Sequence, residues 1–202
     1  FDEITRQGNE VLCLTLSSRL SGAYGSAMAA AKELPDRNIT VFDARTTGGG
    51  LYMMVQQAAA LAKKQLSTAE IADRLYALRD TVSVAFSVAD LTPLHQGGRL
   101  GRVRQSINTI LNNHPLFLCQ DGTIVSDGMA RGKTAQQDYL FSKVPPGASH
   151  VIVHHAGKES RGALELASRL RAAHPTAKVS VRVLGPVLTV HLGFSALCVV
   201  WM

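Results

Sequence analysis

The chain has 202 residues, of which 46% are hydrophobic and 18% are charged. This composition excludes a disordered chain, and the length suits one large domain or two small ones with buried cores. The formal net charge is +6, but Lys and Arg are scattered along the sequence. We interpret this charge as a preference for an anionic ligand or partner, and we expect no nucleic-acid interface.

No apolar stretch reaches the roughly 18 uninterrupted residues that cross a bilayer, and no basic-then-apolar leader is recognisable. We therefore expect a cytoplasmic protein without stable membrane insertion. Cys13, Cys119 and Cys198 each lie in an apolar run without metal-binding spacing. They are predicted to be small buried residues, so neither a disulfide framework nor a metal or other cofactor is expected.

Two strand–turn–helix units open the chain. In order, the predicted elements are a strand at 11–16, a turn at 17–22, a helix at 23–34, a strand at 39–42, a turn at 46–50 and a helix at 51–65. Ser67 and Glu70 form a capping box for the next helix. Such units in series predict parallel strands with right-handed crossovers. Residues 1–80 are therefore predicted to form an N-terminal α/β lobe. Because the chain begins at Phe1, close to its first strand, we expect this lobe to be truncated.

After residue 80 the pattern changes. In order, we expect a strand at 82–88, a short helix ending at 96–99, a helix at 103–111, a hairpin of 116–119 and 123–126, a helix at 134–141, a strand at 150–154, a helix at 160–173 and a strand at 178–183. Asp121-Gly122 suits the positive φ of a tight hairpin turn. Since a hairpin is antiparallel, residues 81–202 are predicted to form a C-terminal lobe with a mixed sheet. Its tail, 185–202, is apolar apart from His191.

The turn after the first strand carries three hydroxyls, those of Ser17, Ser18 and Ser21. A helix N-terminus beside the carboxyl end of a parallel strand favours a carboxylate or phosphate. An ordinary serine helix cap is the alternative interpretation. The turn lacks the Gly-Lys-Ser/Thr of a nucleotide-binding loop and the Gly-x-Ser-x-Gly of a hydrolase elbow.

A second glycine-rich turn and the histidines are the other candidates for ligand binding. Residues 97–102, Gly-Gly-Arg-Leu-Gly-Arg, place two guanidiniums beside flexible backbone, which suits a carboxylate or phosphate but also fits a solvated helix start. His191 is either a ligand contact or a hydrogen-bonded core residue on an apolar strand. His154 and His155 point to opposite faces of their strand, so a metal site with His150 is not expected.

These features occur together, and in this order, in one family. The sequence resembles the DegV family of bacterial fatty-acid-binding proteins. Its Ser-Ser-x-Leu-Ser-Gly-Thr-Tyr signature is similar to residues 17–24, with Ala23 in place of Thr. Its Leu-x-x-Gly-Gly-Arg-Ile element is similar to residues 94–100, and its hairpin and following basic residue to Asp121-Gly122 and Arg131. Its Gly-Pro-Val and His-x-Gly-Pro-Gly ending is similar to 185–193, although Phe194-Ser195 replace Pro-Gly.

The resemblance implies a carrier that buries one long-chain fatty acid between two lobes and presents its carboxylate to a separate fatty acid kinase, which forms an acyl phosphate. It assigns the carboxylate to Ser18, with Ser17 as the alternate, and to His191. Arg99 would support the head group, and Arg102 would meet the kinase. The family's N-terminal threonine loop, a further carboxylate ligand, has no counterpart in this sequence.

The resemblance implies a binding subunit without catalysis of its own. The sequence agrees with this, because no general base stands beside a nucleophile at recognisable spacing. Two alternatives remain. The first is an acyl hydrolase with Ser18 as nucleophile and His191 as base. The second, suggested by the charge alone, is a nucleic-acid-binding regulator, whose affinity would fall steeply with salt.

Overall fold

A computed structural model describes residues 1–99 and 112–202. Arg102 and the helix predicted at 103–111 lie outside the described residues. The chain divides into two units, residues 1–82 together with 121–123, and residues 83–120 together with 124–202. Residues 121–123 are the tip of a hairpin, so the first unit is assembled from two separate parts of the sequence.

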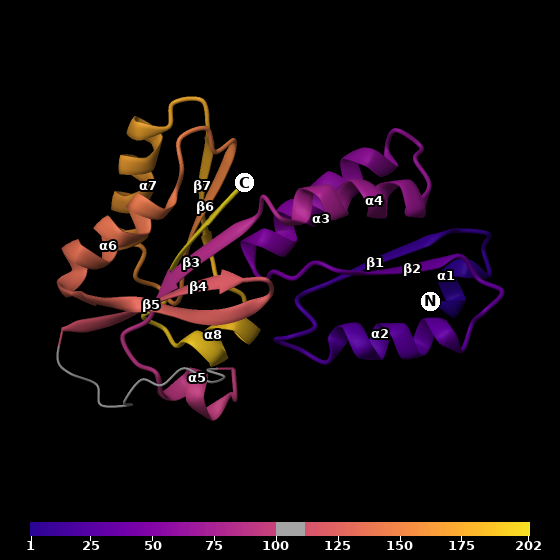
Figure 1. The fold of residues 1–202 in the computed structure, drawn as a ribbon, viewed down its shortest axis with the longest axis horizontal. Helices are drawn as coiled ribbons and strands as arrows, with labels where there is room; N and C mark the ends of the chain where they lie inside the picture. Colours follow the sequence, from indigo (N-terminus) through magenta and orange to yellow (C-terminus); the bar gives the residue numbers. More distant parts are fainter. Residues whose placement is uncertain (100–111) are drawn as a thin grey trace. The chain divides into compact units, whose positions relative to one another are not determined.

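The first unit is a parallel α/β layer structure. Its elements are α1 (Asp2–Thr5), β1 (Val11–Thr15), α2 (Ala23–Lys32), β2 (Ile39–Asp43), α3 (Gly49–Ala62) and α4 (Thr68–Arg79). Strands β1 and β2 pair in parallel, from Val11 opposite Ile39 to Thr15 opposite Asp43. The predicted parallel units are therefore confirmed. Helix α2 lies on one face of this strand pair, while α3 and α4 lie on the other (Figure 1).

Helices α3 and α4 form the core of the first unit with β2. Phe42, Met54 and Leu75 are completely buried at its centre. The predicted capping box starts α4: the backbone N–H of Ser67 donates to Glu70 Oε2 at 2.8 Å, and the N–H of Glu70 donates back to Ser67 Oγ at 3.3 Å. These two bonds satisfy donors that the first helical turn leaves free.

The second unit is built on a mixed sheet. Its elements are β3 (Ser83–Ser87), α5 (Thr92–Gln96), β4 (Asn113–Gln120), β5 (Thr123–Arg131), α6 (Gly132–Lys143), β6 (His150–His155), α7 (Arg161–Ala173), β7 (Lys178–Val183), α8 (Pro186–Leu192) and β8 (Leu197–Trp201). Among the described residues the strand order is β5-β4-β3-β8-β6-β7. Strands β6 and β7 are parallel, while β8 is antiparallel to both β6 and β3. The predicted mixed sheet is confirmed.

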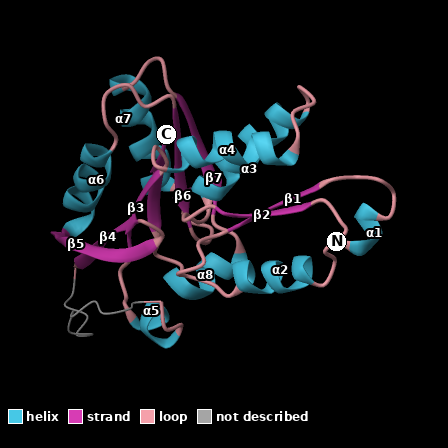
Figure 2. Cartoon of the chain, turned by 45° about the vertical axis from the view of Figure 1, so that its right-hand side comes forward, coloured by secondary structure: helices cyan, strands magenta, loops and turns pink. Residues whose placement is uncertain are grey.

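Helices α6 and α7 cover one face of this sheet (Figure 2). Their apolar side chains, with Leu140, Leu166 and Leu170 fully buried, pack on Val151 and Val153 of β6. Helix α7 begins and ends close to its predicted bounds because its leucines and alanines recur at helical spacing, which places one continuous apolar stripe against the sheet.

The structure of the apolar tail differs from the prediction. His191 was expected on a strand but lies on helix α8. Pro186 fits the first turn of a helix because its φ is preset and its missing N–H would have no partner there. Gly193, at φ 78°, ends the helix, and strand β8 then enters the middle of the sheet between β3 and β6. The hairpin strands are also longer than predicted.

The three cysteines are free. Cys198 is buried in β8, and burial raises the pKa of its thiol to about 12, so it behaves as a small apolar residue. Cys13 and Cys119 are half-buried, so the prediction of burial holds for Cys198 alone. Over residues 1–99 and 112–202, no helix combines the length and the apolarity needed to cross a bilayer.

Candidate ligand-binding residues

The serine turn between β1 and α2 contains two neighbouring hydroxyls in different surroundings. Ser17 is completely buried, and its Oγ donates to the carbonyl oxygen of Gly122 at 2.7 Å. The same oxygen accepts the backbone N–H of Arg19 at 3.2 Å. Because a hydroxyl has one hydrogen to donate, Ser17 has no further donor for a ligand. Its hydroxyl holds the hairpin tip against the turn.

Ser18, in contrast, is exposed. Its backbone N–H donates to Asp43 Oδ1 at 3.1 Å, and this oxygen also accepts the N–H of Arg45 at 3.0 Å. Burial raises the pKa of Asp43, but hydrogen bonds from Ser18 and Arg45 and the Arg45 charge outweigh that effect, so the pKa lies below its ordinary value. An ionised carboxylate therefore stands beside Ser18.

Asp43 was missed in the sequence analysis, although a signal for it was present. It is the last residue of β2, which is parallel to β1 and ends at the same edge of the sheet. The carboxyl ends of neighbouring parallel strands gather polar and ligand-binding groups. Asp43 directly follows the strand predicted at 39–42, just as the serines follow the first predicted strand. Its position therefore marks it as a candidate site residue on the same grounds.

The hairpin turn at Asp121-Gly122 has the positive φ values that its sequence predicts, 47° and 76°. Asp121 forms ion pairs with Arg19 at 2.7 Å and with Arg45 at 2.8 Å. A side chain at residue 122 would overlap Ser17 Oγ, so glycine is required there by sterics as well as by φ. The Asp-Gly sequence thus fixes a turn that fits closely over the serine loop.

His191 and the Gly97-Gly98-Arg99 turn come together within the second unit, where α5 and α8 are in contact. The ring of His191 lies where a side chain on Gly97 would be, and its Nδ1 is buried without a hydrogen-bond partner among the described residues. Arg99 is exposed, and its guanidinium donates to the carbonyl of Gly97. Two motifs that are about 90 residues apart in sequence therefore form one cluster.

The two histidines that end β6 lie on different faces of the sheet. His154 lies opposite Cys198 and His155 opposite Leu197, so the two rings project to opposite faces of the sheet, as predicted. Within the described residues, no group of three or more His, Cys, Asp or Glu side chains could hold a metal ion.

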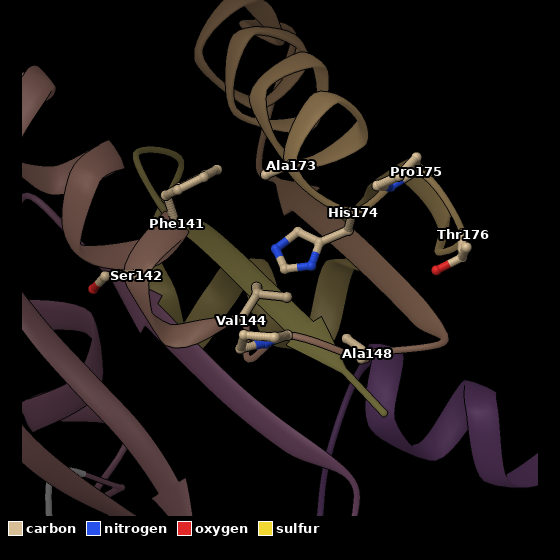
Figure 3. A pocket seen from close by; sticks show the side chains of 10 residues that line it. Phe141, Ser142, Val144, Ala148, Ala173, His174, Pro175 and Thr176 are labelled. Atoms are coloured by element: carbon tan, nitrogen blue, oxygen red, sulfur yellow. The ribbon is translucent and has the colours of Figure 1, made fainter.

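A shallow pocket of about 430 Å³ lies where α6 and α7 end (Figure 3). The imidazole of His174 lies beside Val144, and the walls include Phe141 and Ala148. The ring centroids of Phe141 and His174 are 6.5 Å apart. Since helix C-termini present carbonyl oxygens and partial negative charge, this pocket is unsuited to an anionic head group.

The family model that matches this chain is described as an uncharacterised protein of the DegV family, and it matches residues 1–202. The chain belongs to the DegV family. A DegV domain-containing protein of Halalkalibacterium halodurans is 30% identical over 207 residues, covering 100% of this chain and 73% of that protein. Another, from Staphylococcus aureus, is 26% identical over 201 residues, covering 98% of this chain and 72% of the relative.

Solved structures share the fold. A fatty-acid-binding DegV family protein from Thermus thermophilus has a TM-score of 0.86 at 28% identity, covering 98% of this chain and 74% of that one. A stearic acid-binding protein from Eubacterium ventriosum has a TM-score of 0.82 at 25% identity, covering 100% and 73%. The fatty acid kinase B3 protein of Streptococcus pneumoniae, loaded with linoleic acid, has a TM-score of 0.86, with 99% and 75% covered. Its 20% identity shows a shared fold alone. The family resemblance and the predicted α/β fold are confirmed.

Proposed function

We propose that this protein binds a long-chain fatty acid, with the carboxylate held by Ser18 and His191 and supported by Arg99. Family membership carries the proposal, together with the likeness to a fatty-acid-binding DegV family protein at 28% identity and to a stearic acid-binding protein at 25% identity. A carboxylate that leaves water must accept several hydrogen bonds, and bonds to a charged group are the strong ones.

Ser18 is the better candidate of the two serines for the head group. Its side chain is exposed and hydrogen-bonds to Asp43 at the surface, whereas Ser17 is buried and its hydroxyl hydrogen is donated to Gly122. The neighbouring Asp43 is negatively charged and would repel a second carboxylate. Cationic or neutral donors such as Arg99 and His191 are therefore needed to make binding favourable.

His191 suits the role because its ring lies close against Gly97 while its Nδ1 has no hydrogen-bond partner among the described residues. Gly97 leaves room for the ring. A buried polar atom without a partner costs about 1–3 kcal/mol, which a ligand that supplies the missing bond would recover.

We also propose that the protein presents the carboxylate to a separate kinase and does not catalyse a reaction itself. The fold likeness to the Streptococcus pneumoniae fatty acid kinase B3 protein motivates the partner. Arg102, beside the Gly97–Arg99 turn in sequence, is the residue proposed to contact it.

Native mass spectrometry of the mildly extracted protein tests the proposal. One fatty acid per chain, identified by its mass, is the expected result. Ser18→Ala and His191→Ala should each weaken fatty-acid binding about ten- to hundredfold. Ser26→Ala, at an exposed serine of α2, is the matched control. Turnover of acyl esters that is lost in Ser18→Ala would identify a hydrolase instead, and unchanged oleate affinity in both variants would place the carboxylate elsewhere.

A further inference from the structure

A second cavity lies in the second unit, at the opposite ends of α6 and α7 from the pocket in Figure 3. Its volume is about 860 Å³, within the usual range for small-molecule sites. The N-terminal turns of α6 and α7, the carboxyl end of β6 and residues 194–197 form its walls. None of Ser18, Arg99 and His191 lines this cavity.

Two imidazoles in the cavity wall lack hydrogen-bond partners. His155 is 8% exposed, and its Nδ1 is sealed from solvent without a partner among the described residues. His114, half-buried on β4, has the same unpartnered Nδ1. Buried polar atoms in proteins are nearly always hydrogen-bonded, so two histidines with an unpartnered ring nitrogen in the wall of one cavity are unusual.

The α6 side of the cavity is positively charged. Helix α6 has no side-chain cap and no acidic residue in its first turn. The N–H of Gly132 donates to the carbonyl of Asn112 at 2.8 Å, so the N–H groups that follow it and the partial positive charge of the helix remain available. Lys133 belongs to this turn, and it forms no ion pair with the described residues. Burial first, and then the charge of Lys133, lower the pKa of His114, which agrees with a cation close to that ring.

The acidic groups of the cavity are already engaged by the protein. Glu159 Oε1 accepts the backbone N–H of Arg161 at 2.7 Å. Glu165 accepts from Arg161 Nε at 3.0 Å and from Gln137 Nε2 at 3.3 Å. Both carboxylates are thus engaged by the protein, and Glu165 receives a donor from each helix. Hydrogen bonds from Arg161 and Gln137, and then the charges of Arg161 and Lys133, lower the pKa of Glu165. Lys133 itself forms no ion pair within the described residues, so an anion at the start of α6 would give it a partner.

We propose that this cavity binds a small molecule carrying a phosphate group, with the phosphate at the N-terminus of α6 beside Lys133, His114 and His155. A phosphate offers acceptor oxygens in several directions, which suits donors that converge from three different elements. The remaining volume holds the body of the ligand. Phe194, 78% exposed in the cavity wall, offers an aromatic face to that body.

Histidine side-chain NMR of the full chain tests this site, with AMP, ribose 5-phosphate and adenosine as probes. AMP and ribose 5-phosphate should shift the ring signals of His114 and His155, and adenosine, which lacks the phosphate, should not. A His155→Gln variant assigns its signal. Shifts that are as large with adenosine, or no shift with either phosphate compound in the millimolar range, would overturn the proposal.

Lys133→Gln should weaken AMP binding about tenfold or more, because it removes a charge-assisted contact to the phosphate. Lys178→Gln, at an exposed lysine outside the cavity, is the matched control and should bind AMP as the parent does. Thermal unfolding of both variants checks that they fold. Fatty-acid binding should be unchanged in Lys133→Gln, so failure of this site is distinguishable from failure of the function proposed above. Equal loss of AMP binding in both lysine variants would indicate general charge attraction and would refute the site.

Discussion

The ring of His191 occupies the space that a side chain on Gly97 would fill, so these two residues fit together only while residue 97 is glycine. Gly97 has an ordinary helical φ, and alanine would therefore be tolerated by its backbone. The closest atom to such a side chain is Nδ1 of His191, followed by the ring carbon Cε1 and the carbonyl oxygen of Pro93, so the histidine is the main reason for glycine at this position. This contact couples the Gly-Gly-Arg turn to the position of the imidazole.

Gly97→Ala should push the His191 ring aside and weaken fatty-acid binding as much as His191→Ala does. Gly98→Ala is the matched control. Residue 98 has a φ of 68°, and a side chain there would meet no atom within 4 Å. That substitution should cost about 1 kcal/mol of stability through backbone strain but leave His191 in place. The His191 ring signal in NMR and fatty-acid titration measure the two outcomes, and an unmoved ring in Gly97→Ala would contradict the coupling.

Ser17→Ala and Ser18→Ala should have opposite effects although the residues are adjacent. Ser17→Ala leaves the carbonyl of Gly122 without its buried donor, so it should lower the free energy of unfolding by about 1–3 kcal/mol. Ser18→Ala, at an exposed site, should change stability little and reduce fatty-acid affinity. Urea unfolding and ligand titration of both variants separate the roles. If the Ser17→Ala protein is as stable as the parent but binds fatty acid more weakly, Ser17 and not Ser18 contacts the carboxylate.

His154 should make the protein sensitive to mild acid. Burial, with the nearby charge of Arg182, lowers its pKa to about 4 from an ordinary 6.5. Above pH 6.5 the ring is neutral in both the folded and the unfolded state, and it has no effect. Below that pH the unfolded state takes up the proton first, so stability should fall by roughly 3 kcal/mol between about pH 6.5 and 4.

A His154→Leu variant should lose this part of the pH dependence, because the buried ring is replaced by an apolar side chain. Denaturant unfolding at pH 7 and pH 5 provides the measurement. His95→Gln, at an exposed histidine of α5, should keep the slope of the parent protein. Parallel curves for the parent and His154→Leu would show that the ring is accessible to protons in the folded state.

Asp43→Asn should destabilise the protein at neutral pH, because the Ser18 and Arg45 N–H groups lose a charged acceptor. The folded-state pKa of Asp43 is depressed, so its contribution is present above the unfolded pKa of about 3.9 and is lost as pH falls through the lower folded value. The difference in stability between the parent and the variant should therefore shrink in acid. Asp73→Asn, at an exposed position of α4, is the control. A difference that stays constant down to the most acidic pH tested would argue against an ionised Asp43.

Most of the fold could be predicted from the sequence because its signals are local. The apolar run at Val11–Thr15, the capping box at Ser67 and the Asp121-Gly122 turn each depend on neighbouring residues only, and each forms where predicted. The tail was harder, because Pro186–Leu192 is apolar enough for a strand. Its helix is decided by Pro186 and Gly193 at its ends and by packing against α5.

For the candidate site, too, local sequence predicts one part and contacts between distant residues decide the rest. The sequence by itself determined which residue types gather after the first strand and in the Gly-Gly-Arg turn, and it identified the family. Only the tertiary structure decided that Ser17 is buried under Gly122 while Ser18 is exposed, that Asp43 lies beside Ser18, and that His191 rests on Gly97. These relationships join residues from 25 to 105 positions apart, and they depend on strand pairing and helix packing, which no local pattern encodes.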